Sequence, residues 1–441
     1  MIKINFIVYI ITFLLLVTKA YSLSSSSYLM ANSALLNYDY DSANNYFKNS
    51  NIISFNKSDL NKKLLAFINS FSINEASSIA REIIENDQTN EQAWLVYLAD
   101  AKLKALNKPF DEFEELKHNE KMHLINTIFY KEKKLIEDNI IIANHIYEIL
   151  SSVYLSKSEE YMNYDYLLFY ISLSVQLNES FDEAYFSLGR IYQNLKKYNK
   201  AEVFYNRINQ NHDLFLESRI NIAKNKKYIK NKKSAESDFL LLMKNYPENE
   251  VLLSSLADFY RMNKEYKKAI KNYSKILSKS KIENQEKWLI LYMRGICYER
   301  LNNWKLAEED FMQSLEINPE TPQVLNYLAY GWIERNIFLD KSLEMLKIAN
   351  KKNPESHYIL DSLAWAHYKK NNLEVASKLM EEVIDRAPDE AVSLDHLGDI
   401  YLAMGRKREA LYMWRQALDL ASPEDDILEE VKTKLKKYNA G

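Results

Sequence analysis

The sequence predicts an all-α fold, a superhelical solenoid built from helix–turn–helix repeats. The chain has 441 residues but only 6 Gly and 7 Pro, the residues that tight turns prefer, so few sharp turns join its elements. Hydrophobic residues make up 47% of the chain and charged residues 27%, which suits a folded protein rather than a disordered one. The C-terminal half also repeats itself, with prolines at Pro319, Pro354 and Pro388 in the same phase.

The N-terminal segment 1–22 predicts export. Lys3 precedes an apolar run from Ile4 to Val17, and the small residues Ala20 and Ser22 follow it. A basic residue, a short apolar core and then small residues are typical of a secretory signal peptide. Cleavage after Ala20 and cleavage after Ser22 both remain open. The alternative is an uncleaved N-terminal membrane anchor, for which this apolar run is short.

The segment 23–147 is interpreted as degenerate helical repeats. Between residues 110 and 155 the helical periodicity continues without a clean repeat. The charged run from Lys131 to Leu135 is interpreted as the solvated face of a helix, as such runs usually are.

A regular repeat array is expected over 148–421. In the copy that starts at Trp288, small residues stand at positions 8 and 20 (Gly295 and Ala307), and Phe311 stands at position 24. Small residues let two helices approach closely, and bulky residues fill the space between neighbouring helices. We expect a longer surface loop near 278–284, where the phase gains four residues. The eight expected starts are Glu148, Asp182, Leu216, Glu250, Trp288, Gln323, His357 and Ala391.

The segment 422–441 is expected to form a capping helix. Ser422 would cap its N-terminus ahead of Pro423 at the first helical position. Val431 and Leu435 lie on its apolar face, and Lys434 belongs to a basic last turn that suits the helix dipole. A solenoid needs a terminal helix with a polar outer side, which this segment provides.

The repeat residues and their spacing resemble the tetratricopeptide repeat, a helix–turn–helix unit of 34 residues. The segments 326–330, 361–366 and 395–399 carry a narrower resemblance, to exported tetratricopeptide proteins of Gram-negative bacteria, especially alphaproteobacteria. This resemblance implies an envelope location and a role in binding proteins. It supplies no catalytic residues.

The inner groove of such a stack is the candidate binding site. In each repeat the first helix is called helix A and the second helix B. The resemblance places helix A on the concave side, with positions 2, 5, 9, 12 and 13 pointing into it. Those positions predict a groove that is basic in its middle and aromatic and acidic towards its C-terminal end. Alternatively, several of the aromatic residues pack between repeats. The candidate residues are Arg190, Lys224, Lys227, Arg261, Tyr292, Tyr327, Tyr358, Asp361, Trp365, Tyr368, Asp395 and Asp399.

Aromatic side chains provide large contact areas in protein interfaces. We therefore expect alanine at Trp365 or Tyr327 to weaken partner binding without unfolding the chain.

The sequence gives little support for nucleic-acid binding, for a metal site or for catalysis. The formal net charge is −3, which gives no bulk charge for nucleic-acid binding. Cys297 is the single cysteine, so no intramolecular disulfide can form, and we expect it to be a small buried side chain. His396 lies beside Asp395 and Asp399, but these are interpreted as ordinary neighbours on one helix. We expect no metal, no cofactor and no enzymatic activity.

A lysine cluster spans Lys226 to Lys233 at the turn of one repeat. Its ordinary interpretation is a solvated turn. The functional alternative is contact with anionic lipid headgroups or an acidic partner.

The predicted function is a scaffold in the periplasm or cell envelope that binds protein partners through its groove. One alternative is a glycan- or peptidoglycan-binding assembly factor, suggested by the Tyr and Trp residues. Another is a regulatory subunit of an envelope enzyme. Because a fold does not fix a function, the partner and the oligomeric state stay open.

Overall fold

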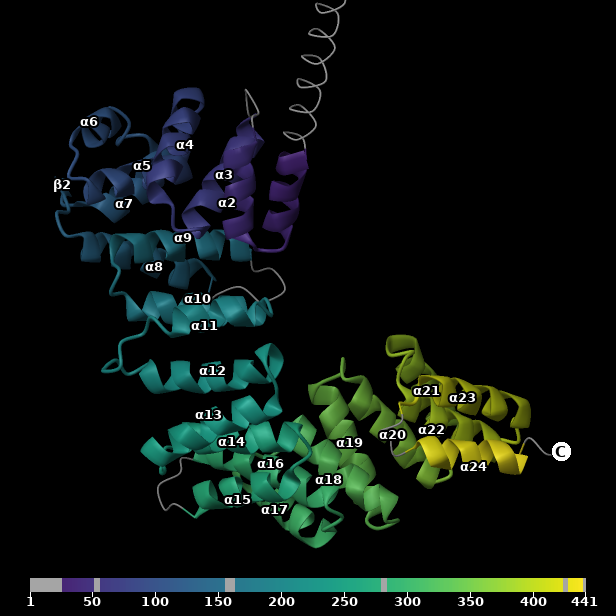
Figure 1. The fold of residues 1–441 in the computed structure, drawn as a ribbon. Coiled ribbons are helices and arrows are strands. Elements are labelled where there is room, and N and C mark those ends of the chain that lie inside the picture. The colour runs from purple at the N-terminus through teal and green to yellow at the C-terminus, as the bar shows by residue number, and fades with distance from the viewer. Residues whose placement is uncertain (1–25, 51–55, 155–162, 279–283, 423–426, 439–441) are drawn as a thin grey trace, which may run out of the picture. The chain divides into compact units, whose positions relative to one another are not determined.

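The computed structural model describes residues 26–50, 56–154, 163–278, 284–422 and 427–438. Within these ranges helices follow one another in packed pairs (Figure 1), and the predicted all-α solenoid of helix–turn–helix repeats is confirmed. The chain divides into two compact units, 1–238 and 239–441. The predicted signal segment 1–22 lies outside the described residues. Within the described ranges, no helix combines the length and apolarity that a membrane crossing requires.

The first unit begins with helices capped by polar side chains. The Asn56 side chain accepts a hydrogen bond from the amide of Asp59, and Asn90 accepts one from the amide of Ala93. Such caps satisfy backbone groups that a helix start leaves free. These helices cover 26–36, α2 (Tyr40–Asn49), α3 (Lys57–Asn69), α4 (Ile73–Asn86) and α5 (Glu91–Leu103).

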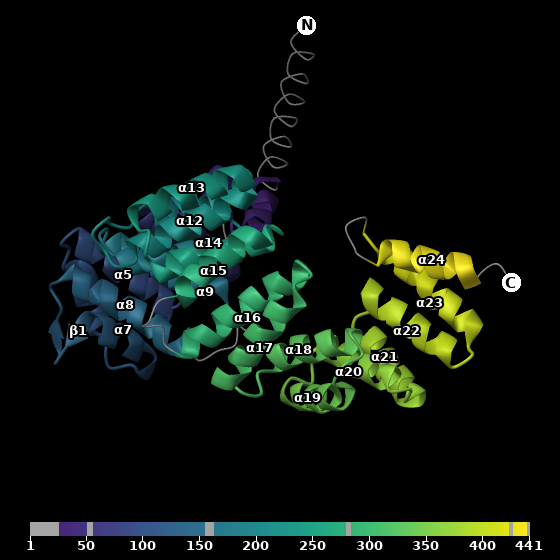
Figure 2. The ribbon, with the colours of Figure 1, turned by 90° about the horizontal axis from the view of Figure 1, so that it is seen from below.

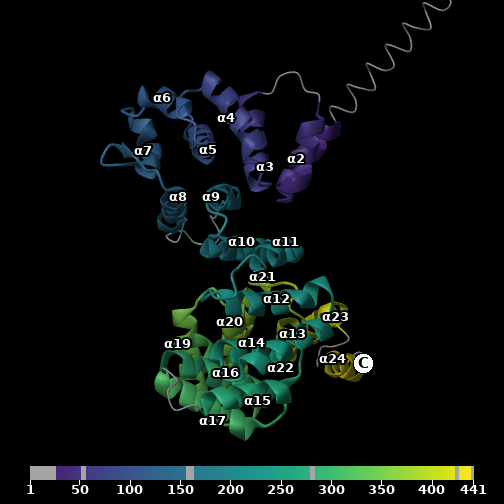
Figure 3. The same ribbon diagram turned by 60° about the vertical axis from the view of Figure 1, so that its left-hand side comes forward.

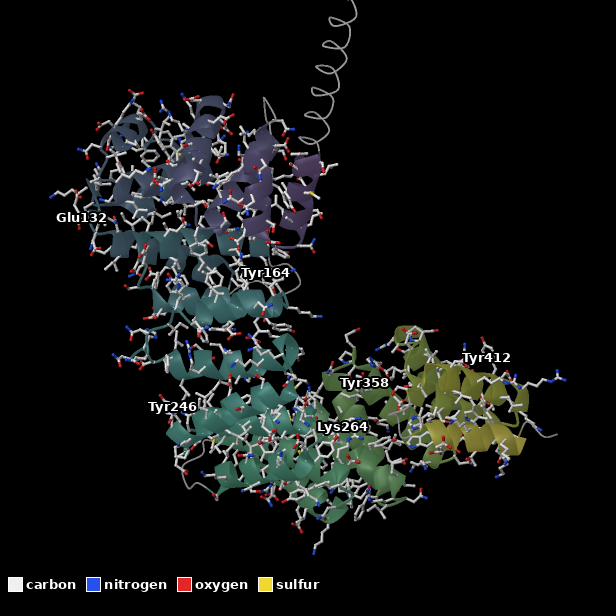
Figure 4. All side chains as sticks on the ribbon, viewed as in Figure 1. Glu132, Tyr164, Tyr246, Lys264, Tyr358 and Tyr412 are labelled. Carbon is white, nitrogen blue, oxygen red and sulfur yellow. The ribbon has the colours of Figure 1, made fainter. Side chains whose placement is uncertain are left out.

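The stretch after α5 departs from the prediction of degenerate repeat helices. The charged run from Lys131 to Leu135 is a β-hairpin, so its interpretation as a helix face was wrong. Glu132 and Lys133 form the two-residue turn with φ of 50° and 65°, which is the backbone that tight hairpins need. Figure 4 labels Glu132 at this turn. The elements are α6 (Lys108–Glu114), the 3₁₀ helix η1 (Glu120–Met122), α7 (His123–Phe129), β1 (Tyr130–Lys131), β2 (Lys134–Leu135) and α8 (Asn139–Tyr154).

The first expected repeat start does not coincide with the start of a helix. The predicted helix start at Glu148 was wrong, because α8 already begins at Asn139. The predicted starts at Asp182 and Leu216 agree with the structure to within one residue. Figure 3 shows the pair α8–α9 next to the pair α10–α11. The remaining helices that begin in the first unit are α9 (Tyr164–Leu177), α10 (Asp182–Asn194), α11 (Tyr198–Tyr205), α12 (Phe215–Ile229) and α13 (Lys232–Asn245).

The second unit follows the repeat closely. Four of its helices begin within one residue of the predicted starts at 250, 323, 357 and 391. The exception is α16, which begins at Asn284, four residues before Trp288, so part of the extra length is helical. The helices that begin in the second unit are α14 (Glu250–Met262), α15 (Tyr266–Leu277), α16 (Asn284–Arg300), α17 (Trp304–Ile317), α18 (Pro322–Glu334), α19 (Leu339–Lys352), α20 (His357–Lys369), α21 (Leu373–Arg386), α22 (Ala391–Ala403), α23 (Lys407–Leu420) and α24 (Leu428–Tyr438).

Close approach between helices A and B depends on position 8. A Cβ atom added at Gly295 would lie 2.6 Å from the ring of Phe311, and one added at Gly398 would lie 2.5 Å from the ring of Trp414. Cys297 is buried in the same helix as Gly295, and burial raises its thiol pKa to about 12. Small residues at position 8 therefore make room for the aromatic residue at position 24.

The last helix packs along α23 (Figure 2). Its Val431 is fully buried in a core cluster that includes Trp414. The predicted cap at Ser422–Pro423 falls partly on residues 423–426, outside the described ranges. The helix thus covers the apolar side of the last repeat, as a terminal solenoid helix should.

Candidate functional site

The first unit carries three of the predicted groove residues. Arg190 on α10 and Lys224 on α12 are exposed. Lys227 is half-buried, and its Nζ lies 5.7 Å from the ring centre of Tyr228. All three basic side chains therefore reach the surface of the first unit. The remaining nine predicted residues belong to the second unit.

Arg261 and two tyrosines of the second unit serve packing. The Nη2 of Arg261 lies 3.3 Å from a carboxylate oxygen of Asp258, which also accepts a hydrogen bond from the Tyr273 hydroxyl at 2.6 Å. Tyr292 is buried and meets the half-buried Tyr327 edge to face, with ring centres 5.5 Å apart. For Tyr292 the alternative of packing between repeats describes the structure better than exposure in a groove.

Trp365 lies at the centre of an aromatic stack. The Tyr368 ring is 4.6 Å away with an interplanar angle of 22°, and the His396 ring is 4.0 Å away at 16°. The indole Nε1 donates a hydrogen bond to Glu334 Oε1 at 2.6 Å. Since Trp365 is buried and already stacked on two rings, alanine at this position would disturb packing as well as any binding.

His396 is a buried residue that the sequence analysis did not select. Its Nδ1 lies 3.1 Å from Oδ2 of Asp361, which is one repeat earlier on α20. Burial lowers the pKa of His396, but the carboxylates of Asp361, Asp395 and Asp399 raise it more, so the net shift is upward. The nearby carboxylates therefore favour the protonated form of the ring that stacks on Trp365.

The free energy of unfolding of the second unit is expected to fall as pH rises from about 6.5, the usual histidine pKa, through the higher pKa of folded His396. A raised pKa means that the folded state holds the proton more tightly, so this contribution is complete below the unfolded pKa and lost above the folded one. Asp395, whose pKa burial raises to about 6, acts in the same direction at lower pH. Urea unfolding followed by tryptophan fluorescence over a pH series measures the effect.

The control for this pH dependence is a second histidine. His396→Gln should flatten the slope above about 6.5. His367→Gln should leave this slope unchanged, because burial and two nearby lysines lower the pKa of His367 rather than raise it. Equal slopes in the wild type and in His396→Gln would contradict the assignment.

Lys434 of α24 joins the acidic end of the predicted groove. Its Nζ lies 2.8 Å from a carboxylate oxygen of buried Asp395, 2.8 Å from one of Asp399 and 3.1 Å from one of Glu430. These three carboxylates lie close enough together to share a cation. The Lys434 ammonium supplies that charge, and although burial lowers its pKa, Asp395 and Asp399 raise it more. The arrangement is an internal ion cluster that fastens α24 to α22.

An open pocket of about 740 Å³ lies beside this ion cluster. Its aromatic walls are Tyr368, Trp414 and Tyr438, and its acidic groups include Asp399 and Glu430. Tyr368 and Asp399 are predicted groove residues that border this open space. The contribution of α24 was not predicted, because its sequence pattern indicates only a cap.

Tyr358 is the most exposed of the predicted aromatic residues. Its side chain is 60% exposed, and its hydroxyl donates a hydrogen bond to Glu390 at 3.1 Å. Figure 4 labels it together with Tyr412, a tyrosine of similar exposure on α23. The two residues form a natural pair for comparing a helix A with a helix B.

Comparison with known proteins identifies the repeat. Residues 182–209, 288–321 and 391–421 each match a family described as tetratricopeptide repeat. The chain contains tetratricopeptide repeats. The matched segments begin at the predicted starts Asp182, Trp288 and Ala391. Proteins of this kind bind protein partners and generally act as interaction modules.

The chain is also similar to a curated relative and to solved structures. A TPR repeat-containing protein of Pseudomonas aeruginosa is 30% identical over 110 residues, which are 25% of this chain and 18% of that protein's length. A tetratricopeptide repeat protein from Parabacteroides merdae is 21% identical with a TM-score of 0.45, covering 58% of this chain and 98% of that one. A chain of the APC/C hetero-tetramer Cut9–Hcn1 is 13% identical with a TM-score of 0.48, covering 94% of this chain and 96% of that one.

Proposed function

We propose that the chain is a non-enzymatic scaffold of the bacterial cell envelope, which holds a segment of a protein partner against the helix A face of its second unit. Support for a scaffold comes from the tetratricopeptide repeats. Support for export comes from the apolar run from Ile4 to Val17 and the small residues after it. The narrower resemblance to exported alphaproteobacterial proteins is part of the proposal.

The observation that carries the proposal is the pocket beside α22. Tyr368 and Asp399 come from helix A positions, and Trp414 lies in the same wall. Lys434 and Lys437 line the pocket together with the carboxylates, so its charged groups are of both signs. A partner segment would place a side chain with apolar and polar atoms in the pocket, against the ring of Tyr368, and would lie against exposed Tyr358.

The glycan-binding alternative receives less support. Sugar rings bind by stacking on aromatic faces, and the most promising such ring is Trp365. Tyr368 and His396 are stacked on it. No observation favours a regulatory subunit of an enzyme over a scaffold.

The proposal is tested by comparing Tyr358→Arg with Tyr412→Arg in a tagged full-length chain. Both tyrosines are exposed, at 60% and 56%, so both variants should fold. Tyr358→Arg should reduce the amount of the envelope partner that co-purifies by about tenfold, since an interface aromatic often contributes more than ~1.4 kcal/mol. Tyr412→Arg should leave the amount of co-purified partner unchanged. Equal retention by both variants would contradict binding at the helix A face.

Cell fractionation tests the compartment separately. The chain should be recovered with the envelope, either shortened by about 20 residues or tethered at its N-terminus. Recovery mainly from the cytosol would contradict export while leaving the groove proposal open to the variant test.

A further inference from the structure

The charge of this protein is distributed very unevenly. The chain as a whole has a formal charge of −3. The segment 196–233 contains 11 Lys and Arg against 3 Asp and Glu, a net charge of +8, so the rest of the chain carries −11. A local excess of this size creates an attractive potential for anions although the protein as a whole is acidic.

Ring stacking brings two turns of this segment together. The first turn joins α10 to α11 and the second joins α12 to α13. Tyr198 at the start of α11 flanks the first turn, and Tyr228 at the end of α12 flanks the second. Their rings stack with centres 4.6 Å apart and an interplanar angle of 11°. Tyr228 is 56% exposed. The basic residues of both turns therefore share one edge of the first unit.

Some lysines near this edge are neutralised and others are not. Lys200 lies 3.0 Å from a carboxylate oxygen of Asp41, and Lys226 lies 2.5 Å from one of Asp238. Over the ranges that the structure describes, no ion pair engages the five lysines that we call the lysine edge. These are Lys196, Lys197, Lys227, Lys230 and Lys233.

We propose that the lysine edge docks the first unit onto an anionic phospholipid surface. Lysine ammonium groups act as point charges, and clusters of this size attract anionic headgroups without specific geometry. The edge consists of turns and the helix ends beside them rather than a groove, so it suits a flat partner better than an extended acidic peptide. The half-exposed tyrosine pair fits the same partner, because tyrosine rings favour the membrane–water interface. This docking is independent of the groove in the second unit.

Vesicle flotation with the full-length chain tests the docking. The probes are phosphatidylcholine vesicles with and without phosphatidylglycerol. The neutral vesicles account for any binding through the apolar run 4–17, which both variants below retain. The edge variant is Lys196→Gln, Lys197→Gln, Lys227→Gln, Lys230→Gln and Lys233→Gln. The matched control makes the same charge change at exposed lysines of the second unit, as Lys267→Gln, Lys271→Gln, Lys305→Gln, Lys378→Gln and Lys407→Gln.

We expect the wild type and the control variant to prefer the anionic vesicles, and salt to weaken this preference. The edge variant should bind anionic vesicles at least about tenfold more weakly. Equal losses in both variants would mean that only net charge matters and would overturn the proposal. No preference for anionic vesicles would also overturn it, and binding to soluble polyglutamate alone would assign the edge to an acidic protein instead.

Discussion

Replacing Trp414 by alanine is expected to lower the free energy of unfolding of the second unit by about 3–5 kcal/mol. The indole is fully buried at position 24 of the last repeat, where the absence of a Cβ on Gly398 makes room for it. It also donates a hydrogen bond from Nε1 to Asp399 at 3.2 Å and stacks on Tyr438. Alanine would leave a cavity at the junction of α22, α23 and α24, which urea unfolding followed by circular dichroism measures.

The control for this prediction lies two residues away on the same helix. Tyr412 is 56% exposed, so Tyr412→Ala should change the free energy of unfolding by less than ~0.5 kcal/mol. A similar loss in both variants would show that the helix, rather than the contact between positions 8 and 24, sets the stability.

Replacing Lys434 by methionine is expected to cost about 3 kcal/mol near neutral pH, because it leaves Asp395 as an unpaired buried carboxylate. Burial already raises the pKa of Asp395 to about 6 with Lys434 in place. The loss should therefore shrink in acid, where Asp395 takes up a proton and needs no partner. Chemical unfolding at a series of pH values measures this change.

Two further variants separate charge pairing from the loss of a long side chain. Asp395→Asn combined with Lys434→Met should recover part of the loss, because the buried charge is then gone. Lys432→Met removes an exposed lysine whose ion-pair partner among the described residues is exposed Glu429, and it should cost little. No recovery in the double variant would contradict the pairing.

The repeat phase was predictable from the sequence because it is set by local packing. Gly295 must lie against Phe311 and Gly398 against Trp414, so the same spacing recurs wherever the same helix pair forms. The hairpin at 130–135 was not predictable in this way. Its turn residues Glu132 and Lys133 are neither Gly nor Asn, the usual signals for a turn with positive φ.

The candidate groove residues were chosen by repeat position, which does not give the exposure of a side chain. Repeat positions indicate which way a side chain points, and they placed Trp365 and Asp361 on helix A correctly. They do not indicate what the next repeat contributes, and here His396 approaches both residues from α22. Lys434 joins Asp395 and Asp399 from a helix outside the repeat, so its role depended on packing that the periodicity does not contain.

Site-specific photocrosslinking in living cells tests the proposed scaffold most directly. A photoreactive phenylalanine derivative would replace Tyr358 in one strain and Tyr412 in another, and the products would be identified by mass spectrometry. We predict one abundant envelope protein crosslinked from position 358 and absent from position 412. Crosslinks of equal yield from both positions, or to cytosolic proteins only, would contradict an envelope scaffold that binds through its helix A face.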